Sequence, residues 1–443
     1  MTVWQSTGSI GRFDVVVAGA GSAGSTAAIA AARQGARVLL VEKLPFLGGN
    51  STAVLDTFYG FYAPGSRPLR LVGGIPWEVV EGLRALGPVL ERPNTYGAGT
   101  GVTYNSEHLK VAWEDLVIGA GVKVLLHAFV QDVAVNDGRV LGLLVATKAG
   151  LRRVEAAAFV DASGDADLSH FAGFGYELAG DIAPAQTLTT TFRMVNVDAA
   201  TRRTIDKERM RALMLEAART GYDLPRRDGS DHVTPIAGMT ATVMTRLDSA
   251  VRDEAGVLHS VLDPDALTAA EIAGRRQALE YGRFLRDLVP GYADASLAWL
   301  STQIGLRETR RVYGDYRVTR EDVLGARQFD DQVALCGAPI EDHHSGDGTG
   351  WQYLPDGTAV GIPLRALVVR DATNVMVAGR CFSATHDAHA SIRSMAQTMA
   401  MGQAAGTAAA IAAAEAGGDV RAVAPSRVRE ALRAGGAILE LEA

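Results

Sequence analysis

Three glycines near the start of the chain have the spacing that binds phosphate. Gly19, Gly21 and Gly24 form G-x-G-x-x-G directly after the β-branched run at residues 15–17, which is typical of a buried parallel strand. The first glycine permits a tight turn, the second lets a pyrophosphate approach the backbone, and the third lets the following helix pack on the strand. That helix, expected over residues 25–34, directs free N–H groups at the phosphates. The pattern predicts a dinucleotide site.

An acid and a glycine doublet follow where dinucleotide folds differ from one another. Glu42 ends the expected second strand, residues 37–41, about 20 residues past the glycines, where a carboxylate accepts the ribose hydroxyls. A plain NAD domain turns back into a helix at this point. Here Gly48 and Gly49 precede Asn50, Ser51 and Thr52, which favours a backbone passing close to a second phosphate or a planar ring. This stretch resembles flavoproteins of the glutathione-reductase-like FAD fold.

Later segments support an FAD domain. Residues 122–147 alternate as strands around a turn at residues 136–138, which predicts a β-meander with Val130 near the adenine. The next strand ends in the small-residue turn Asp161 to Asp165, expected against the AMP half. Near the C-terminus, a strand at residues 375–378 ends at Gly379-Arg380. A helix starting near Ser391 is expected to direct its dipole at the flavin pyrimidine edge.

Three motifs together resemble the bacterial FAD-dependent oxidoreductase family, which is related to fumarate reductase and succinate dehydrogenase flavoproteins. They are GLRETRRVYGDYRVTREDV from Gly305, GIPLRALV from Gly361, and VMVAGRCFSATHDAHASIRSMAQTMAMGQAAGTAAA from Val375. The resemblance implies an α/β fold: a Rossmann-like FAD-binding domain of glutathione-reductase type, with a parallel sheet plus β-meander, and an inserted α+β cap or substrate domain. The sequence departs from the family at Ala390, often glycine, and at Leu364, often tyrosine.

The expected domain order follows from these motifs. The FAD-binding domain is expected to comprise residues 12–60, 101–180 and a C-terminal return at 370–436, with a substrate-side excursion at 61–100 and the cap at 181–369. The expected FAD contacts are Gly19, Gly21, Ser22, Ala23, Gly24, Glu42, Lys43, Gly48, Gly49, Asn50, Ser51, Thr52, Val130, Ala162, Ser163, Gly164, Gly379, Arg380, Ala390, Ser391 and Ile392. Cys381 is interpreted as a buried small residue, so non-covalent FAD is favoured over covalent.

Flavin chemistry usually needs an acid or base beside the ring, so histidines and arginines on segments that reach it are catalytic candidates. His386 and His389 precede the expected flavin-facing helix, whose dipole would favour a neutral imidazole. His343 and His344 lie in a glycine-rich stretch interpreted as a loop, where no metal site is expected. Arg307 and Arg393 could hold a substrate carboxylate or an anionic flavin. An internal salt-bridge network is the alternative for the Arg307 motif.

Composition excludes several classes of protein. The chain has 443 residues, a net charge of -7 and two cysteines without a C-x-x-C pattern. An acidic chain with no basic patch argues against a nucleic-acid partner, and the cysteines exclude zinc-ribbon and iron–sulfur sites. No apolar run reaches the roughly 18 residues of a membrane span, and no signal peptide is visible, so a cytoplasmic location is expected.

The leading hypothesis is an FAD-dependent dehydrogenase or oxidase of a small organic metabolite, acting by hydride transfer to flavin N5. A reductase of an activated alkene is the alternative enzyme, and an electron-relay subunit is the alternative of another class. Because no second G-x-G-x-x-G follows a strand, no internal NAD(P)H domain is expected. Electrons would then pass to oxygen or an external carrier. The oligomeric state stays open, a homo-oligomer included.

Overall fold

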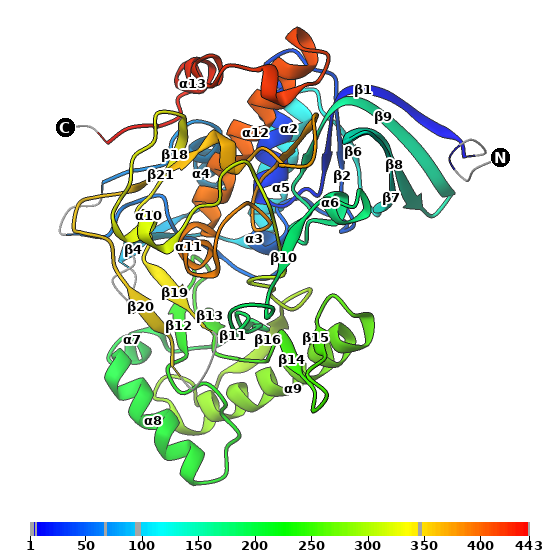
Figure 1. The fold of residues 1–443 in the computed structure, drawn as a ribbon. Helices are drawn as coiled ribbons and strands as arrows, with labels where there is room; N and C mark the ends of the chain where they lie inside the picture. Colours follow the sequence, from blue (N-terminus) through cyan, green and yellow to red (C-terminus); the bar gives the residue numbers. More distant parts are fainter. Residues whose placement is uncertain (1–3, 5–6, 66–68, 94–98, 344–347, 442–443) are drawn as a thin grey trace.

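A mixed sheet, parallel in its inner strands, forms the upper right part of the molecule as drawn in Figure 1. The computed structural model describes residues 4, 7–65, 69–93, 99–343 and 348–441. Valine and leucine dominate the inner strands because both faces of such a sheet are covered. In the described part the sheet has seven strands in the order β6-β2-β1-β9-β8-β7, with β22 beside β9. Their bounds are β1 (Ser9–Ala18), β2 (Val38–Val41), β6 (Lys123–Leu125), β7 (Phe129–Asn136), β8 (Arg139–Thr147), β9 (Gly150–Asp161) and β22 (Val375–Val377).

Strand β9 belongs to two kinds of pairing at once. Its first half runs antiparallel to β8, which pairs antiparallel with β7, and this makes the meander. Its second half runs parallel to β1 and β22. The strand therefore carries the chain from the meander into the parallel sheet and ends at Asp161, beside the end of β1 at Ala18. The carboxyl ends of these strands meet at one edge, which is where open α/β sheets bind ligands.

Helices α2 (Ser22–Arg33) and α12 (Met395–Glu415) pack side by side on the sheet (Figure 1). α12 is buried on nearly every side, and small residues give it a narrow surface. A Cβ atom on Gly402 would overlap the carbonyl oxygen of Ala23, and one on Gly406 would overlap that of Ala27. The two backbones therefore approach closely at two successive turns of each helix. The expected helix at residues 25–34 begins three residues earlier, directly after Gly21.

A second unit, which we call the cap (residues 192–300), lies below the sheet in Figure 1. It has its own apolar cluster, formed by side chains such as Phe192, Met214 and Phe284. Its sheet has the order β12-β13-β11-β16; helix α9 packs against β16, and α8 packs against α9. The bounds are β11 (Phe192–Val195), α7 (Ala199–Arg202), α8 (Lys207–Arg219), β12 (Ser230–Val233), β13 (Thr240–Val243), β14 (Ala250–Arg252), β15 (Leu258–Ser260), α9 (Pro264–Leu288) and β16 (Ser296–Leu300).

The chain enters and leaves the cap at one place. Thr189 and Gly305 form an antiparallel bridge with two backbone hydrogen bonds, Gly305 N to Thr189 O at 2.7 Å and the reverse at 3.2 Å. After Gly305 the chain returns to the sheet side, because Val333 and Leu335 share an apolar cluster with the central strands. We call the part of the molecule built around the seven-stranded sheet the sheet unit. Residues 305–369, which were expected in the cap, pack largely against this unit.

The remaining elements surround the central sheet. The stretch at Pro339 interpreted as a loop is instead partly a hairpin, in which β19 pairs antiparallel with β20. None of the helices in the described ranges is long and apolar enough to cross a membrane. The bounds are α3 (Asn50–Ala53), β3 (Thr57–Phe58), α4 (Ile75–Leu86), β4 (Leu90–Pro93), β5 (Thr100–Thr103), α5 (Ser106–Gly119), α6 (Asp167–Phe171), β10 (Tyr176–Leu178), β17 (Arg310–Val312), α10 (Arg320–Leu324), β18 (Gln332–Cys336), β19 (Ile340–Asp342), β20 (Gly350–Gln352), β21 (Val360–Pro363), α11 (His386–Ile392) and α13 (Pro425–Ala434).

The contact between α2 and α12 gives a test of the fold. Replacing Gly406 by alanine places a methyl group on the Ala27 carbonyl and forces the helices apart. We expect a loss of about 1–3 kcal/mol in the free energy of unfolding, measured by urea denaturation. The control is Gly119→Ala at the end of α5, where a Cβ atom meets nothing within 4 Å. Equal stability of the two variants would contradict this packing.

Candidate functional site

A cavity of about 300 Å³ lies where the carboxyl edge of the sheet meets the cap. Its volume is at the lower end of the range for ligand sites. The two glycine motifs, the turn after β9, and segments on both sides of the cap boundary all contribute to its lining. Among the expected site residues, those that line it are Gly19, Gly21, Ser22, Ala23, Glu42, Lys43, Gly48, Gly49, Asn50, Ser51, Val130, Ala162, Ser163, Gly164, Arg307, Gly379, Arg380 and Arg393.

The two glycine motifs support each other at one wall of this cavity. Gly21 and Gly48 form a parallel bridge, and Gly48 N donates to Ala20 O at 2.7 Å. Gly49 has a φ of 55°, and a Cβ atom there would lie 2.8 Å from the Gly21 Cα. A Cβ atom on Gly21 itself would meet nothing within 4 Å. The wall therefore presents bare backbone to the cavity, beside the start of α2, which no side chain caps.

Glu42 links the carboxyl ends of the first two strands, β1 and β2. One carboxylate oxygen accepts a hydrogen bond from Ala20 N at 2.6 Å, and the other accepts from Leu44 N at 2.8 Å. Burial raises the pKa of Glu42, and these backbone donors oppose that shift. Glu42 lines the cavity, and each carboxylate oxygen has a second lone pair, so it can accept hydrogen bonds from hydroxyl groups of a ligand.

The turn after β9 is held by buried carboxylates. Asp161 is fully buried and accepts hydrogen bonds from Ser163 and Ser169. Asp165 lies 2.9 Å from Arg380 Nη2, and Lys43 lies 4.0 Å from its other oxygen. Burial alone would raise the pKa of Asp165, but these two cations outweigh it and hold the pKa below its usual range. The cluster fixes the backbone of residues 162–164 against the cavity.

The C-terminal helix differs from the expectation of one helix starting near Ser391. Helix α11 begins at His386, capped by Thr385, and ends at Ile392; the chain then breaks and α12 begins at Met395. The break turns Arg393 and Met395 to the cavity, while Ala390, Ser391 and Ile392 do not line it. Ser391 instead donates a 2.6 Å hydrogen bond to the Ala338 carbonyl. Thr52 and Gly24 also lie behind the wall, where Thr52 bonds to Leu47 and Gly24 packs against Gly19.

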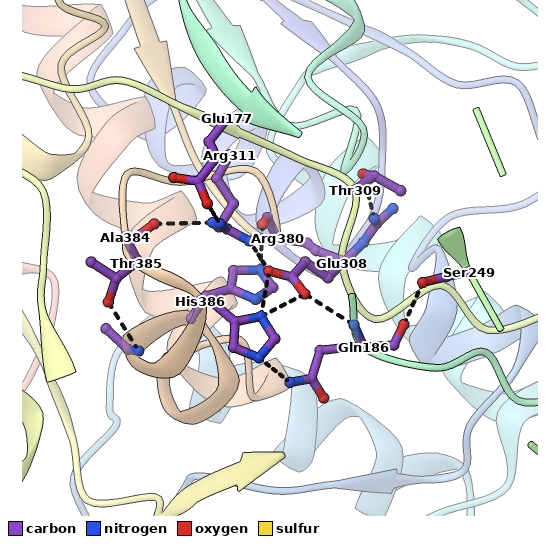
Figure 2. Close-up of polar contacts among 12 residues, drawn as sticks. Glu177, Gln186, Ser249, Glu308, Thr309, Arg311, Arg380, Ala384, Thr385 and His386 are labelled. Atoms are coloured by element: carbon purple, nitrogen blue, oxygen red, sulfur yellow. Dashed lines mark hydrogen bonds and ion pairs between the residues drawn. The ribbon is translucent and has the colours of Figure 1, made fainter. Parts of the chain in front are cut away.

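The RETRR motif points in two directions. Arg307 lines the cavity and donates to the Thr187 carbonyl at 2.6 Å. Glu308 and Arg311 are fully buried and join an ion-pair network with Glu177, shown in Figure 2. Because buried charges must be paired, this network fixes the segment on which Arg307 stands. The salt-bridge interpretation therefore applies to Glu308 and Arg311, whereas the binding role of Arg307 stays a prediction.

His386 belongs to that network rather than to the cavity lining (Figure 2). Its Nδ1 lies 3.0 Å from Glu308, and its Nε2 lies 3.2 Å from the Gln186 side-chain amide. His389 is fully buried, stacks on Phe382, and its Nε2 contacts the Arg380 carbonyl at 2.7 Å. Burial, more than any helix dipole, pushes the pKa of His389 well below its ordinary value, and this histidine does not line the cavity either.

His343 stands behind the cavity and supports Glu341. Its Nε2 lies 2.9 Å from the Glu341 carboxylate and its Nδ1 lies 3.1 Å from the Thr349 hydroxyl. Burial and the charge of Arg307 lower the pKa of His343 to about 3, so it is neutral at neutral pH. Burial raises the pKa of Glu341, but His343 with Arg393 and Arg307 outweighs it and brings the pKa to about 2. His344 lies outside the described residues.

The chain was compared with known proteins. A family model for FAD-dependent oxidoreductases matches residues 14–432, which is nearly the whole chain. The chain belongs to the FAD-dependent oxidoreductase family. Among curated proteins, it is 36% identical over 144 residues to thiamine thiazole synthase from Aeropyrum pernix. That match covers 30% of this chain and 44% of the relative, so less than half of the relative's length is spanned.

Solved structures of flavoenzymes are similar at low identity. A geranylgeranyl bacteriochlorophyll reductase-like protein from Thermoplasma acidophilum is 15% identical, with 96% of this chain and 83% of that chain covered and a TM-score of 0.43. The p-nitrophenol 4-monooxygenase PnpA from Pseudomonas putida DLL-E4 is 12% identical, with 95% and 84% covered and a TM-score of 0.44. The protein is an oxidoreductase that uses FAD, as the family match establishes.

The residues present fit FAD. The open space over Gly21 is the kind of gap that a pyrophosphate fills, because any side chain there would occupy it. Glu42 offers acceptors suited to ribose hydroxyls. Ala128, Phe129 and Val130 line the cavity at the start of the meander and suit an adenine. Cys381 is fully buried, contacts backbone carbonyls and does not line the cavity, so it behaves as the small core residue that the sequence suggested.

Several cavity residues escaped the sequence analysis. Asp167 follows the strand-ending turn, two residues after the expected Asp165, and this acidic spacing was a usable signal. Thr189, Thr191, Val243, Leu267, Glu271, Gln303, Ile304 and Leu306 line the cavity from segments of the cap and its boundary, without any local motif. Gln303 marks this boundary, since its amide donates to Asn50 Oδ1 at 3.2 Å. Within the described ranges, no histidine is among the lining residues.

Gly21 gives a direct test of cofactor retention. We expect Gly21→Asp to fold but to purify without flavin, because its Cβ has room while its carboxylate would enter the space for the phosphates. Visible absorption of the purified protein measures the bound flavin. Gly21→Asn is the matched control for charge, since it is equally large and neutral, and it should retain more flavin. A fully yellow Gly21→Asp protein would refute this placement of the phosphates.

The buried His343 predicts acid sensitivity. The folded pKa of about 3 lies below the ordinary 6.5, so the unfolded chain binds a proton that the folded protein refuses. Stability from this group is present above pH 6.5 and falls by about 1.4 kcal/mol per pH unit on acidification towards pH 3. We expect His343→Gln to lose less stability than wild type between pH 7 and pH 5 in urea titrations. Parallel pH profiles for the two proteins would contradict this.

Proposed function

We propose that the protein is a dehydrogenase or oxidase of a small organic molecule that reaches the flavin through the cavity beneath the cap. One observation carries the proposal: a single cavity is lined both by the glycine wall that suits the FAD phosphates and by cap and boundary residues that suit a substrate. Domain boundaries at the cap are a common place for such sites. The electron-relay alternative gains no support from this arrangement, because a relay needs no substrate cavity.

FAD, when bound, supplies the two-electron acceptor. In the proposed reaction a hydride leaves a substrate carbon and a proton leaves the adjacent oxygen or nitrogen, so a double bond forms. The two electrons then pass to oxygen or an external carrier. The chain's own part is positional: Asn50 and Ser51 border the cavity beside the glycine wall, and Arg307 and Arg393 border it near the cap. The proposed histidines that the structure describes, His343, His386 and His389, do not line the cavity, so we propose His343 and His386 as supports and not as bases.

The finer fold and the cofactor linkage are part of this proposal. The strand β9, shared between a meander and a parallel sheet, supports the glutathione-reductase type of FAD domain. We propose a cap that ends near residue 305 instead of 369, because later residues pack with the central strands. We also propose non-covalent FAD, since the buried Cys381 and the histidines His386 and His389 are not exposed to the cavity.

A spectrum and an anaerobic titration test the function. The purified protein should show flavin absorption, and acid precipitation should release FAD into the supernatant. Under anaerobic conditions, an alcohol or amine substrate should bleach the flavin, and air should restore the colour. Colour that stays in the pellet would contradict non-covalent binding. The flavin could instead be bleached only by external reductants and recoloured by an activated alkene. That result would favour the reductase alternative and contradict the dehydrogenase proposal.

A further inference from the structure

Two arginines that line the cavity have few hydrogen-bond partners among the described residues. Arg307 stands on the boundary segment and Arg393 follows α11, and both line the cavity. Within the described part of the chain, Arg307 donates one hydrogen bond, to the Thr187 carbonyl, and Arg393 donates one at 3.3 Å, to the Glu341 carbonyl. The Arg393 Nε is buried and has no hydrogen-bond partner among the described residues. Each guanidinium has five donors, so most of their capacity is unused.

The electrostatics of this corner favour an anion. Burial, then repulsion from Arg393 and Arg226, lowers the pKa of Arg307. Arg226 is paired with Asp228 at 2.6 Å; Glu341 attracts both Arg307 and Arg393, and Asp342 also attracts Arg393. The strongest charge effects on Arg307 come from three arginines and one carboxylate, so positive charge predominates around this half-buried guanidinium. An incoming anion would relieve that repulsion and use the spare donors.

An apolar wall faces the same cavity. Leu306 adjoins Arg307 in sequence, and it packs with Ile304 and Leu267 in one small hydrophobic cluster. These three side chains line the cavity together with Val243 of the cap and Val54 of the sheet unit. Apolar surface that lines a cavity gains free energy when a ligand covers it. The lining thus offers cations at one place and hydrocarbon beside it.

We infer that the cavity binds an amphipathic carboxylic acid. Its carboxylate would lie between Arg307 and Arg393, and its hydrocarbon or aromatic body would lie against the apolar wall formed by Leu267, Ile304 and Leu306. This inference rests on the proposed function and specifies its substrate class. A small polar dicarboxylate does not match, because the apolar wall would stay uncovered. A neutral alcohol does not match either, because the two guanidinium groups would stay unpaired.

Calorimetric titration of the FAD-loaded protein tests the inference without turnover. The probes are hexanoate and phenylacetate, with hexanamide and phenylacetamide as neutral matches and acetate as the match without an apolar body. We expect at least one of the two larger carboxylates to bind about 10-fold or more tightly than both its amide and acetate. Amides that bind as well as the acids, or carboxylates that do not bind measurably, would overturn the inference.

Variants assign the two parts of the site. Arg307→Met and Arg393→Met should each weaken carboxylate binding by about 10-fold or more, and the lysine replacements should restore part of it. Leu267→Asn should weaken hexanoate but leave acetate unchanged. Arg211→Met, on the exposed surface of α8, is the matched control. A visible spectrum checks that each variant keeps its flavin.

Three outcomes distinguish a failure of this inference from a failure of the proposed function. If the arginine variants shift the flavin spectrum while carboxylate affinity stays the same, the cations serve the cofactor and the inference is wrong, although the proposed function stands. If the wild-type protein carries no flavin, or no substrate bleaches it, the proposed function itself fails. Carboxylate affinity that is unchanged in both Arg307→Met and Arg393→Met, with normal spectra, also overturns the inference.

Discussion

The close approach of α2 and α12 sets the position of almost everything else in the site. Gly402 and Gly406 let the second helix lie directly on the backbone of Ala23 and Ala27. The start of α2 carries the first glycine motif, and the start of α12 carries Met395 and the neighbouring Arg393. Two parts of the chain about 370 residues apart are thereby held at one cavity. A pair of larger residues on α12 would separate them.

Buried ion pairs away from the cavity fix the segment that carries Arg307. Glu308 and Arg311 lie beside Arg307 in sequence but face inwards, where Glu177 completes their network. The full burial of these ions makes their arrangement intolerant of displacement. Arg307 therefore stands on a rigid segment although its own side chain is sparsely bonded. The same division appears at Arg380, whose guanidinium is paired with Asp165 while the residue borders the cavity.

The sequence predicted what depends on local backbone chemistry. Gly19 and Gly48 were recognisable because only glycine suits their positive φ angles and close neighbours, whereas Gly21 was recognisable by its spacing in the motif, and Glu42 follows at a fixed distance. The meander was visible from alternating residues around a turn. The cap side of the site could not be predicted, because Leu267, Val243 and Leu306 are ordinary apolar residues that only tertiary folding brings together. The burial of His389 was hidden for a related reason: its position near the expected flavin-facing helix did not reveal that the side chain packs on Phe382, away from the cavity lining.

The antiparallel bridge between Thr189 and Gly305 has a consequence for how this protein can diversify. Because the chain crosses into the cap and back through adjacent residues, the cap is a closed excursion with its own apolar cluster. Insertions or replacements within it leave the sheet pairing and the α2–α12 contact intact. The cap's part of the cavity lining, which is Val243, Leu267 and Glu271, is thus free to change by exchange of one contiguous segment, while the cofactor side stays constant. Such an architecture makes this scaffold suited to grafting caps of different chemistry onto one redox unit.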